Sequence, residues 1–108
     1  MSITLDDETI ITSILPLESG FYLSGSRKNK YYKLILIKIN DSLEIEWERT
    51  YGPDTSDTEG HSATLFDDGL LICGCSGGKA TPTGGYGWKA YITMLSLSGD
   101  QIWKRAIR

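Results

Sequence analysis

The sequence SILPLESGFYLSG, from Ser13 to Gly25, recurs at residues 62–74 as SATLFDDGLLICG. The two segments lie 49 positions apart and keep Ser, Gly and Gly at the same three points. Self-similarity at a fixed spacing predicts a fold built from repeated units. Each segment also has the pattern of two strands joined by a tight turn, because Gly, Asp and Ser favour the backbone angles that such turns need.

A second pair of segments extends the repeat towards the C-terminus. Residues 39–49, INDSLEIEWER, match residues 95–105, LSLSGDQIWKR, at a spacing of 56. The spacing grows by seven between residues 25 and 34 of the first copy, which correspond to residues 74–90 of the second. Insertions collect in loops, so the second copy is expected to have a longer loop at this point.

Each copy is predicted to form four strands and essentially no helix, since no segment has an apolar stripe with helical period. Residues 34–39 are apolar on both faces, which predicts a strand covered on both sides, whereas residues 44–51 alternate like an edge strand with one wet face. The predicted strands are Thr9–Leu17, Phe21–Ser26, Tyr32–Ile39 and Glu44–Tyr51, then His61–Phe66, Leu70–Cys75, Lys89–Leu97 and Gln101–Ile107.

These motifs resemble the blades of bacterial β-propellers. The pattern DGG-(aromatic or aliphatic)-x-x-G corresponds to residues 18–25 and 67–74, and the pattern G-x-x-x-W-x-(K/R) to the segments around Trp47 and Trp103. The chain departs from the first pattern at Ser19 and Asp68, where a Gly is usual. The resemblance implies an all-β domain over residues 1–108, with four-stranded antiparallel blades at 1–52 and 53–108. A closed β-sandwich of two four-stranded sheets is the alternative, because its strand pattern is similar.

The resemblance also implies self-association. Propellers have typically about 4–8 blades, so two blades cannot close a ring. Head-to-tail association through rotation closes such a ring, and three chains supplying six blades are the preferred homo-oligomer. In size and plan the chain is similar to two-bladed bacterial fucose-binding lectins, which form rings of this kind. It does not obviously share their sugar-site residues, and none is carried over.

Composition disfavours two classes of partner. The net charge is −3 and the pI about 5.0, and the largest basic group is Arg27, Lys28, Lys30 and Lys33, so a nucleic-acid partner is not expected. The apolar run Leu34–Ile37 is far below the roughly 20 residues that span a membrane. The first residues have no secretory signal, which predicts a cytoplasmic protein unless the chain is a fragment of a longer secreted one.

Neither metal nor cofactor chemistry is expected. Cys73 and Cys75 would lie on one face of a strand about 7 Å apart, which does not suit a disulfide. With His61 remote in the sequence they make a poor metal site, so we expect two small buried side chains in a reducing compartment. Asp54, Asp57 and Glu59 are expected in a solvated loop over residues 52–60.

No catalytic constellation is present, and the protein is not expected to be an enzyme. Residues 74–81, GCSGGKAT, superficially resemble a phosphate-binding loop. They have three residues between the glycines rather than four, Ala80 replaces the required hydroxyl, and Pro82 opposes the necessary helix. Ser62 and His61 are adjacent only in sequence, without the signature of a placed nucleophile.

Aromatic and cationic side chains are the candidate ligand-binding residues. Trp and Arg recur at i and i+2 as Trp47 with Arg49 and as Trp103 with Arg105, where they either pack between repeats or line a ligand pocket. The long loop of residues 76–89 and its counterpart in the first copy should lie at one end of the blades. Their candidate residues are Tyr86, Trp88 and Lys89, and Tyr31 and Tyr32.

Exposed aromatics on Gly-rich loops suit the recognition of sugars or peptides, although they could equally cover the ends of the core. The sequence therefore predicts a non-enzymatic ligand-binding module, with carbohydrate as a candidate ligand. A protein-binding scaffold is the alternative, and an enzyme with a site at chain junctions is the third hypothesis.

Overall fold

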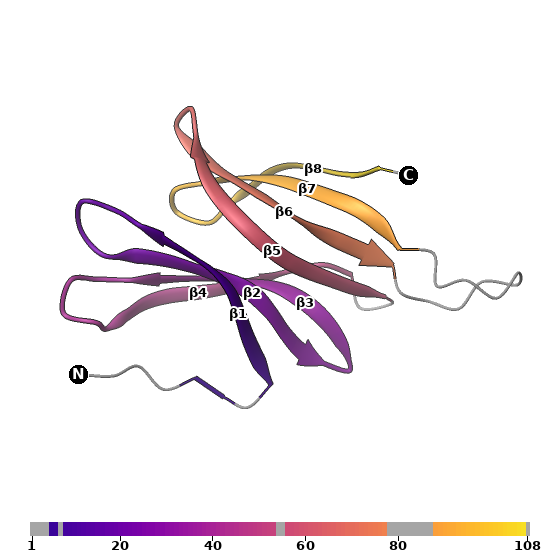
Figure 1. The fold of residues 1–108 in the computed structure, drawn as a ribbon, viewed down its shortest axis with the longest axis horizontal. Coiled ribbons are helices and arrows are strands. Elements are labelled where there is room, and N and C mark those ends of the chain that lie inside the picture. The colour runs from indigo at the N-terminus through magenta and orange to yellow at the C-terminus, as the bar shows by residue number, and fades with distance from the viewer. Residues whose placement is uncertain (1–4, 7, 54–55, 78–87, 108) are drawn as a thin grey trace, which may run out of the picture.

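The chain forms two four-stranded antiparallel sheets (Figure 1). A computed structural model describes residues 5–6, 8–53, 56–77 and 88–107. The first sheet, in the order of its strands, contains β1 (Thr9–Pro16), β2 (Phe21–Asn29), β3 (Tyr31–Ile39) and β4 (Ile45–Tyr51). The second contains β5 (Asp57–Phe66), β6 (Gly69–Gly77), β7 (Lys89–Ser96) and β8 (Gln101–Ile107).

The all-β prediction is confirmed, and each predicted strand is present. Within the described ranges there is no helix, and so none long and apolar enough to cross a membrane. Several strand ends differ from the prediction, and the largest difference is that β5 begins at Asp57 rather than His61. Asp57 and Glu59 therefore belong to a strand and not to a solvated loop, while Asp54 lies outside the described residues. The Asp57 carboxylate accepts a hydrogen bond from the Tyr32 backbone N–H at 2.8 Å, a tertiary contact that the local pattern cannot reveal.

The two sheets share local irregularities as well as strand order. The pairing of β1 with β2 shifts at Thr12, and the pairing of β5 with β6 shifts at His61, which is the matching position of the repeat. The turns after β3 and β7 also use the same backbone hydrogen bonds, with Leu43 and Gly99 both at positive φ. The repeat in sequence therefore corresponds to a repeat in backbone conformation.

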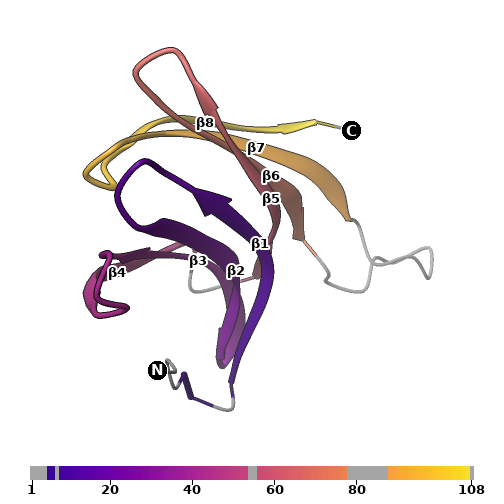
Figure 2. The ribbon, with the colours of Figure 1, turned by 60° about the vertical axis from the view of Figure 1, so that its left-hand side comes forward.

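The main core lies between the sheets, which face each other in both views (Figures 1 and 2). Residues that pair directly across strands share a face of a sheet, so the register assigns each side chain to a side. The first sheet contributes Leu34 and Leu36, and the second contributes Leu70 and Leu95, all buried. The predicted burial of β3 on both faces is confirmed, because Leu34 to Ile37 are all inaccessible.

The sheets do not use equivalent faces to pack. Repeat alignment matches Leu70 and Leu95 of the second sheet to Phe21 and Ile39 of the first, which lie on its outer face, away from the second sheet. The packing is therefore head to tail, with the front of one sheet against the back of the next. A symmetric face-to-face sandwich would instead bury the same face of both sheets.

Gly60 marks the closest approach of the sheets. A side-chain carbon at this position would lie 2.8 Å from the Gly25 carbonyl oxygen and 3.0 Å from Leu34. The Thr12 hydroxyl donates to the Gly60 carbonyl at 2.8 Å from the other side. Because only hydrogen fits here, β5 can lie directly against β1, β2 and β3.

The outer face of the first sheet has its own apolar cluster. Ile35, Ile37 and Ile39 are buried there, with Phe21 and Leu23 packed against them. Leu5, from the segment before β1, covers part of this face.

Candidate functional site

Side chains of the first sheet bind the β7–β8 turn of the second sheet through hydrogen bonds and an ion pair. The Tyr22 hydroxyl donates to the Leu97 carbonyl at 2.6 Å, and the Tyr51 hydroxyl donates to the Gly99 carbonyl. The Arg49 guanidinium forms an ion pair with Asp100 at 2.9 Å. We call Tyr22, Trp47, Arg49 and Tyr51 the clamp.

Trp47 explains why the gripped turn contains Gly99. A side-chain carbon at Gly99 would lie 3.0 Å from the Trp47 ring, and the φ of 91° is one that glycine adopts without strain. Arg49 lies 5.9 Å from the centre of the Trp47 ring, and Tyr22 lies against the same ring at 6.1 Å. Trp47 and Arg49 thus have a packing role between the sheets.

The clamp tyrosine at the end of β4 remains a hydrogen-bond donor. Burial raises the pKa of Tyr51 to about 12, while the nearby Arg49 lowers it and Asp100 raises it. The phenol is therefore protonated at neutral pH and can donate to Gly99.

The second sheet carries equivalent residues on a face that no other sheet of the described chain covers, although its own side chains bury Met94 there. Trp103 and Arg105 match Trp47 and Arg49, and their partners in the register are Met94 and Ile92. We call the face that carries these four residues the open face. Trp103 is 46% exposed, and every residue of β8 is exposed, whereas β4 ends in the buried Tyr51. A groove of about 430 Å³ lies here, lined by Ile92, Trp103, Lys104, Arg105 and Ile107.

The first sheet carries a turn equivalent to the one that the clamp holds. This turn, residues 41–44, has the backbone hydrogen bonds of residues 97–100, and Glu44 matches Asp100 in position and charge. Two differences separate the copies. Leu43 has a side chain where Gly99 has none, and Leu71 and Ile107 replace the hydroxyl donors Tyr22 and Tyr51.

The predicted rim residues lie at one end of the sheets, as far as they are described. Tyr31 and Tyr32 begin β3, with Lys30 and Lys28 about 5.8 and 5.7 Å from their respective rings. The Tyr32 backbone N–H donates to Asp57 at the start of β5. This part of β5 pairs with the end of β6, which in turn pairs with the start of β7. Trp88 is 45% exposed just before β7, whereas Tyr86 lies outside the described residues.

A groove of about 370 Å³ opens at the same end. Residues after β4, at the start of β5 and at the end of β6 line it, with Lys89, Tyr91, Lys104, Arg105 and Ala106 from β7 and β8. The side-chain amide of Gln101 donates a hydrogen bond to the hydroxyl oxygen of the buried Tyr91 at 3.2 Å, which fixes the position of the tyrosine ring. The groove combines the aromatic ring of Tyr91 with three cationic side chains, and Trp88 precedes its lining residue Lys89 in the sequence.

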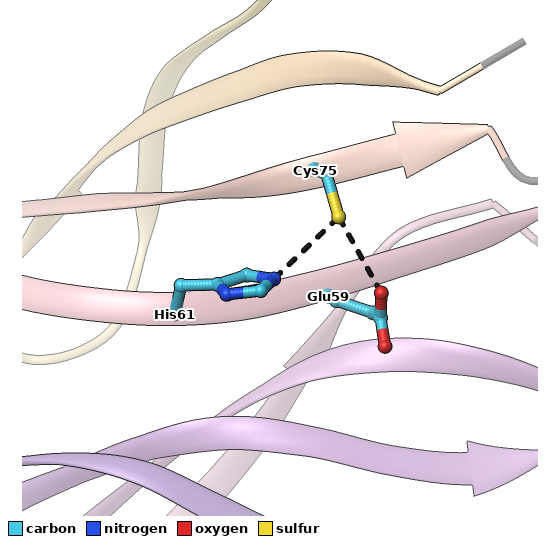
Figure 3. Close-up of side chains that lie close together, drawn as sticks. All are labelled: Glu59, His61 and Cys75. Atoms are coloured by element: carbon cyan, nitrogen blue, oxygen red, sulfur yellow. Dashed lines mark hydrogen bonds between the residues drawn. The ribbon is translucent and has the colours of Figure 1, made fainter.

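A cluster that sequence reasoning missed lies on the same side of the second sheet as the open face, as the strand register shows. Figure 3 shows its three side chains. The Cys75 thiol donates to the Glu59 carboxylate at 3.4 Å and lies 3.5 Å from the His61 Nε2. Donor atoms of all three residues lie within 4.8 Å of one another. We call Glu59, His61 and Cys75 the β5–β6 triad.

Two expectations about the cysteines were wrong in detail. Cys73 is exposed and Cys75 only half-buried, because the side of the second sheet that they occupy has no covering layer within the described part of the chain. His61 is 14 positions from Cys75 in sequence but adjacent to it in space, since β5 pairs antiparallel with β6.

The environment of Cys75 leads to a prediction about its reactivity. Burial, the hydrogen bond to Glu59 and the negative charge of Glu59, in that order, raise the pKa of the Cys75 thiol to about 11. The thiolate is the reactive form, so we expect slow alkylation of Cys75 at pH 8, rising about tenfold per pH unit up to pH about 11. The measurement is iodoacetamide labelling followed by peptide mass spectrometry.

Glu59→Gln is the matched variant for this prediction. It keeps the size of the side chain but removes the charge that opposes ionisation, so Cys75 should be alkylated faster at the same pH. An unchanged rate would show that Glu59 does not control the thiol.

Comparison with known protein families and with curated proteins finds no match to this sequence.

Proposed function

We propose that the chain is a non-enzymatic binding module that assembles head to tail with copies of itself into a closed β-propeller, with three chains forming six blades. The observation that carries the proposal is the open face. Trp103 and Arg105 occupy the positions of two clamp residues, yet the described chain places no turn against them.

The first sheet carries the surface that would pack against the open face of another copy. In the proposed junction, Glu44 of the turn at residues 41–44 forms an ion pair with Arg105 of the next chain. This pair is the equivalent of the ion pair between Asp100 and Arg49 within one chain. The back of the first sheet is apolar, with Phe21 and Leu23 partly exposed and Ile14 63% exposed. Charge and apolar surface thus complement each other between the two ends, as a heterologous interface requires.

The two copies also differ in ways that shape the junction. A junction between chains lacks the two tyrosine hydrogen bonds of the intrachain contact, and it must accommodate the Leu43 side chain beside Trp103. We therefore expect it to be weaker than the contact between the two sheets of one chain.

Solution mass is the first test. Light scattering after gel filtration should give about three times 12.0 kDa, since blades at constant rotation close only at a fixed number. A monomer at micromolar concentration would overturn the ring. A mass equal to another whole number of chains, such as two or four, would change the proposed number of blades.

The ligand that we propose is a carbohydrate bound at the rim. Support comes from the exposed Trp88 indole and from the groove lined by Tyr91, Lys89 and Lys104. Aromatic faces stack on the apolar faces of sugar rings, while amines hydrogen-bond to hydroxyls or pair with acidic groups.

Replacing Trp88 by alanine should abolish glycan binding and leave the fold intact. Its exposed ring contributes little to the core, so its loss removes contact area for a ligand rather than stability. The check is a glycan array with wild type and variant, with circular dichroism as the control of folding. Full affinity in the variant would exclude the rim site.

A further inference from the structure

We infer that the β5–β6 triad is a binding site for a borderline divalent cation of the Zn²⁺ class, with Glu59, His61 and Cys75 as its three protein ligands. The inference stands on geometry within a single chain and needs neither ring assembly nor carbohydrate binding, although the proposed ring would cover this side of the second sheet.

The donor set matches this class of metal. Thiolate, imidazole and carboxylate are the three kinds of group that bind zinc in proteins, and three protein ligands leave the fourth tetrahedral position for water. Mg²⁺ and Ca²⁺ prefer sites made of oxygen, so a sulfur and a nitrogen disfavour them.

Two of the three donor spacings, those that involve the sulfur, match tetrahedral coordination. Metal–sulfur and metal–nitrogen bonds of about 2.3 and 2.0–2.1 Å place the two donors about 3.6 Å apart at a tetrahedral angle. Cys75 Sγ lies 3.5 Å from His61 Nε2 and 3.4 Å from Glu59 Oε2. An ion could therefore replace the thiol proton between these atoms with small side-chain adjustments.

The backbone holds the ligands in this arrangement. Glu59 is directly opposite Cys75 in the pairing of β5 with β6, and the register shift that follows Gly60 leaves His61 as the extra residue. Such bulges re-aim a side chain, and here the imidazole is directed towards the sulfur (Figure 3). Two ligands thus come from β5, one of them at its bulge, and the third comes from the neighbouring β6.

The triad is not a requirement of the repeat. The matching residues of the first sheet are Ile10, Thr12 and Ser26, of which only the two hydroxyl residues are polar. Both hydroxyls contact the Gly60 backbone across the sheets. The second copy therefore carries a ligand set that the fold itself does not need.

Cobalt titration tests the site, because Co²⁺ reports its own ligands. The reduced protein of residues 1–108 should bind one Co²⁺ per chain, giving the intense visible bands of tetrahedral cobalt and a thiolate-to-cobalt charge-transfer band. Added Zn²⁺ should displace it and abolish both signals. Absence of tetrahedral bands at millimolar Co²⁺ would overturn the site.

Matched variants assign the ligands. Cys75→Ser should lose the charge-transfer band, whereas Cys73→Ser, which changes the other cysteine on the same face of β6, should keep it. His61→Ala should weaken binding by more than about tenfold, since loss of a second-shell partner alone costs about 10–100-fold. An unchanged Co²⁺ spectrum in Cys75→Ser would refute the assignment, and His61→Ala provides an independent test if that variant is unstable.

The outcome is separable from that of the proposed function. Metal binding is measured by absorption on a single chain, and assembly by light scattering. A monomer that binds Co²⁺ with a thiolate band would overturn the ring and support the site. Because the ring would cover the side of the second sheet that carries the triad, a trimer is titrated again as the Trp103→Glu monomer, and absence of the band there would overturn the site but not the ring.

Discussion

Replacing Leu36 by alanine should lower the free energy of unfolding by about 2–5 kcal/mol. Leu36 is inaccessible to solvent, and it lies in the core between the two sheets. Removing it leaves a cavity that the β3 backbone, paired on both sides, cannot fill by relaxing. Since small domains have total stabilities of about 5–15 kcal/mol, a loss of this size is a large part of the whole. The measurement is urea unfolding at fixed protein concentration.

Ile14→Ala is the control for this prediction. It deletes similar apolar atoms from an adjacent part of the first sheet, but Ile14 is 63% exposed, so the change within an isolated chain should be below about 0.5 kcal/mol. Equal effects of the two substitutions would contradict the packing between the sheets. Because Ile14 lies on the side of the proposed junction, the comparison is best made below the concentration at which chains associate.

Replacing Trp103 by glutamate should convert the proposed trimer into folded monomers. The substitution places a carboxylate at the centre of the open face, where a junction would bury it without a partner. Light scattering should then show a threefold fall in mass, with an unchanged circular dichroism spectrum because Trp103 contributes little to the core of one chain.

Lys104→Glu is the matched control for Trp103→Glu. Lys104 is the next residue of β8 and borders the groove at this edge strand, but it pairs with Thr93, so its side chain leaves the sheet on the side opposite to Trp103. This variant should keep the assembled mass. Dissociation of both variants alike would show that charge in general, rather than the open face, controls association.

A charge exchange tests the register of the junction. Arg105→Glu should weaken association by placing like charges together, and Glu44→Arg in the same chain should restore it. This expectation follows from the geometry of the intrachain pair Arg49–Asp100. Failure of the second substitution to restore association would exclude the proposed partner.

Much of the fold could be predicted from local features of the chain. Turn residues at Gly20, Asp67 and Gly99 and the apolar alternation between them locate the strands, because turns and period-2 patterns depend on near neighbours. The Trp-Arg repeat also drew attention to Trp47, Arg49, Trp103 and Arg105. It could not tell that the first pair packs between the sheets and the second is exposed, since that depends on which sheet has a neighbour.

The triad shows where local reasoning stops. Counting back from the β5–β6 turn without a bulge would place Gly60 opposite Cys75 and turn His61 to the other face. The register shift after Gly60 instead places Glu59 opposite Cys75. The residue types alone do not predict this shift. It lies next to Gly60, which closely approaches Gly25 and Leu34 of the first sheet.

The amino-acid sequence by itself determined two copies of a four-stranded antiparallel unit, because strand alternation and turn chemistry are encoded within a few residues of each other. Only the tertiary structure decided that the units pack front to back, that an open face remains on the second sheet, and that Glu59, His61 and Cys75 meet. These features depend on strand register and on contacts between sheets, which join residues far apart in the chain and are set by packing as a whole.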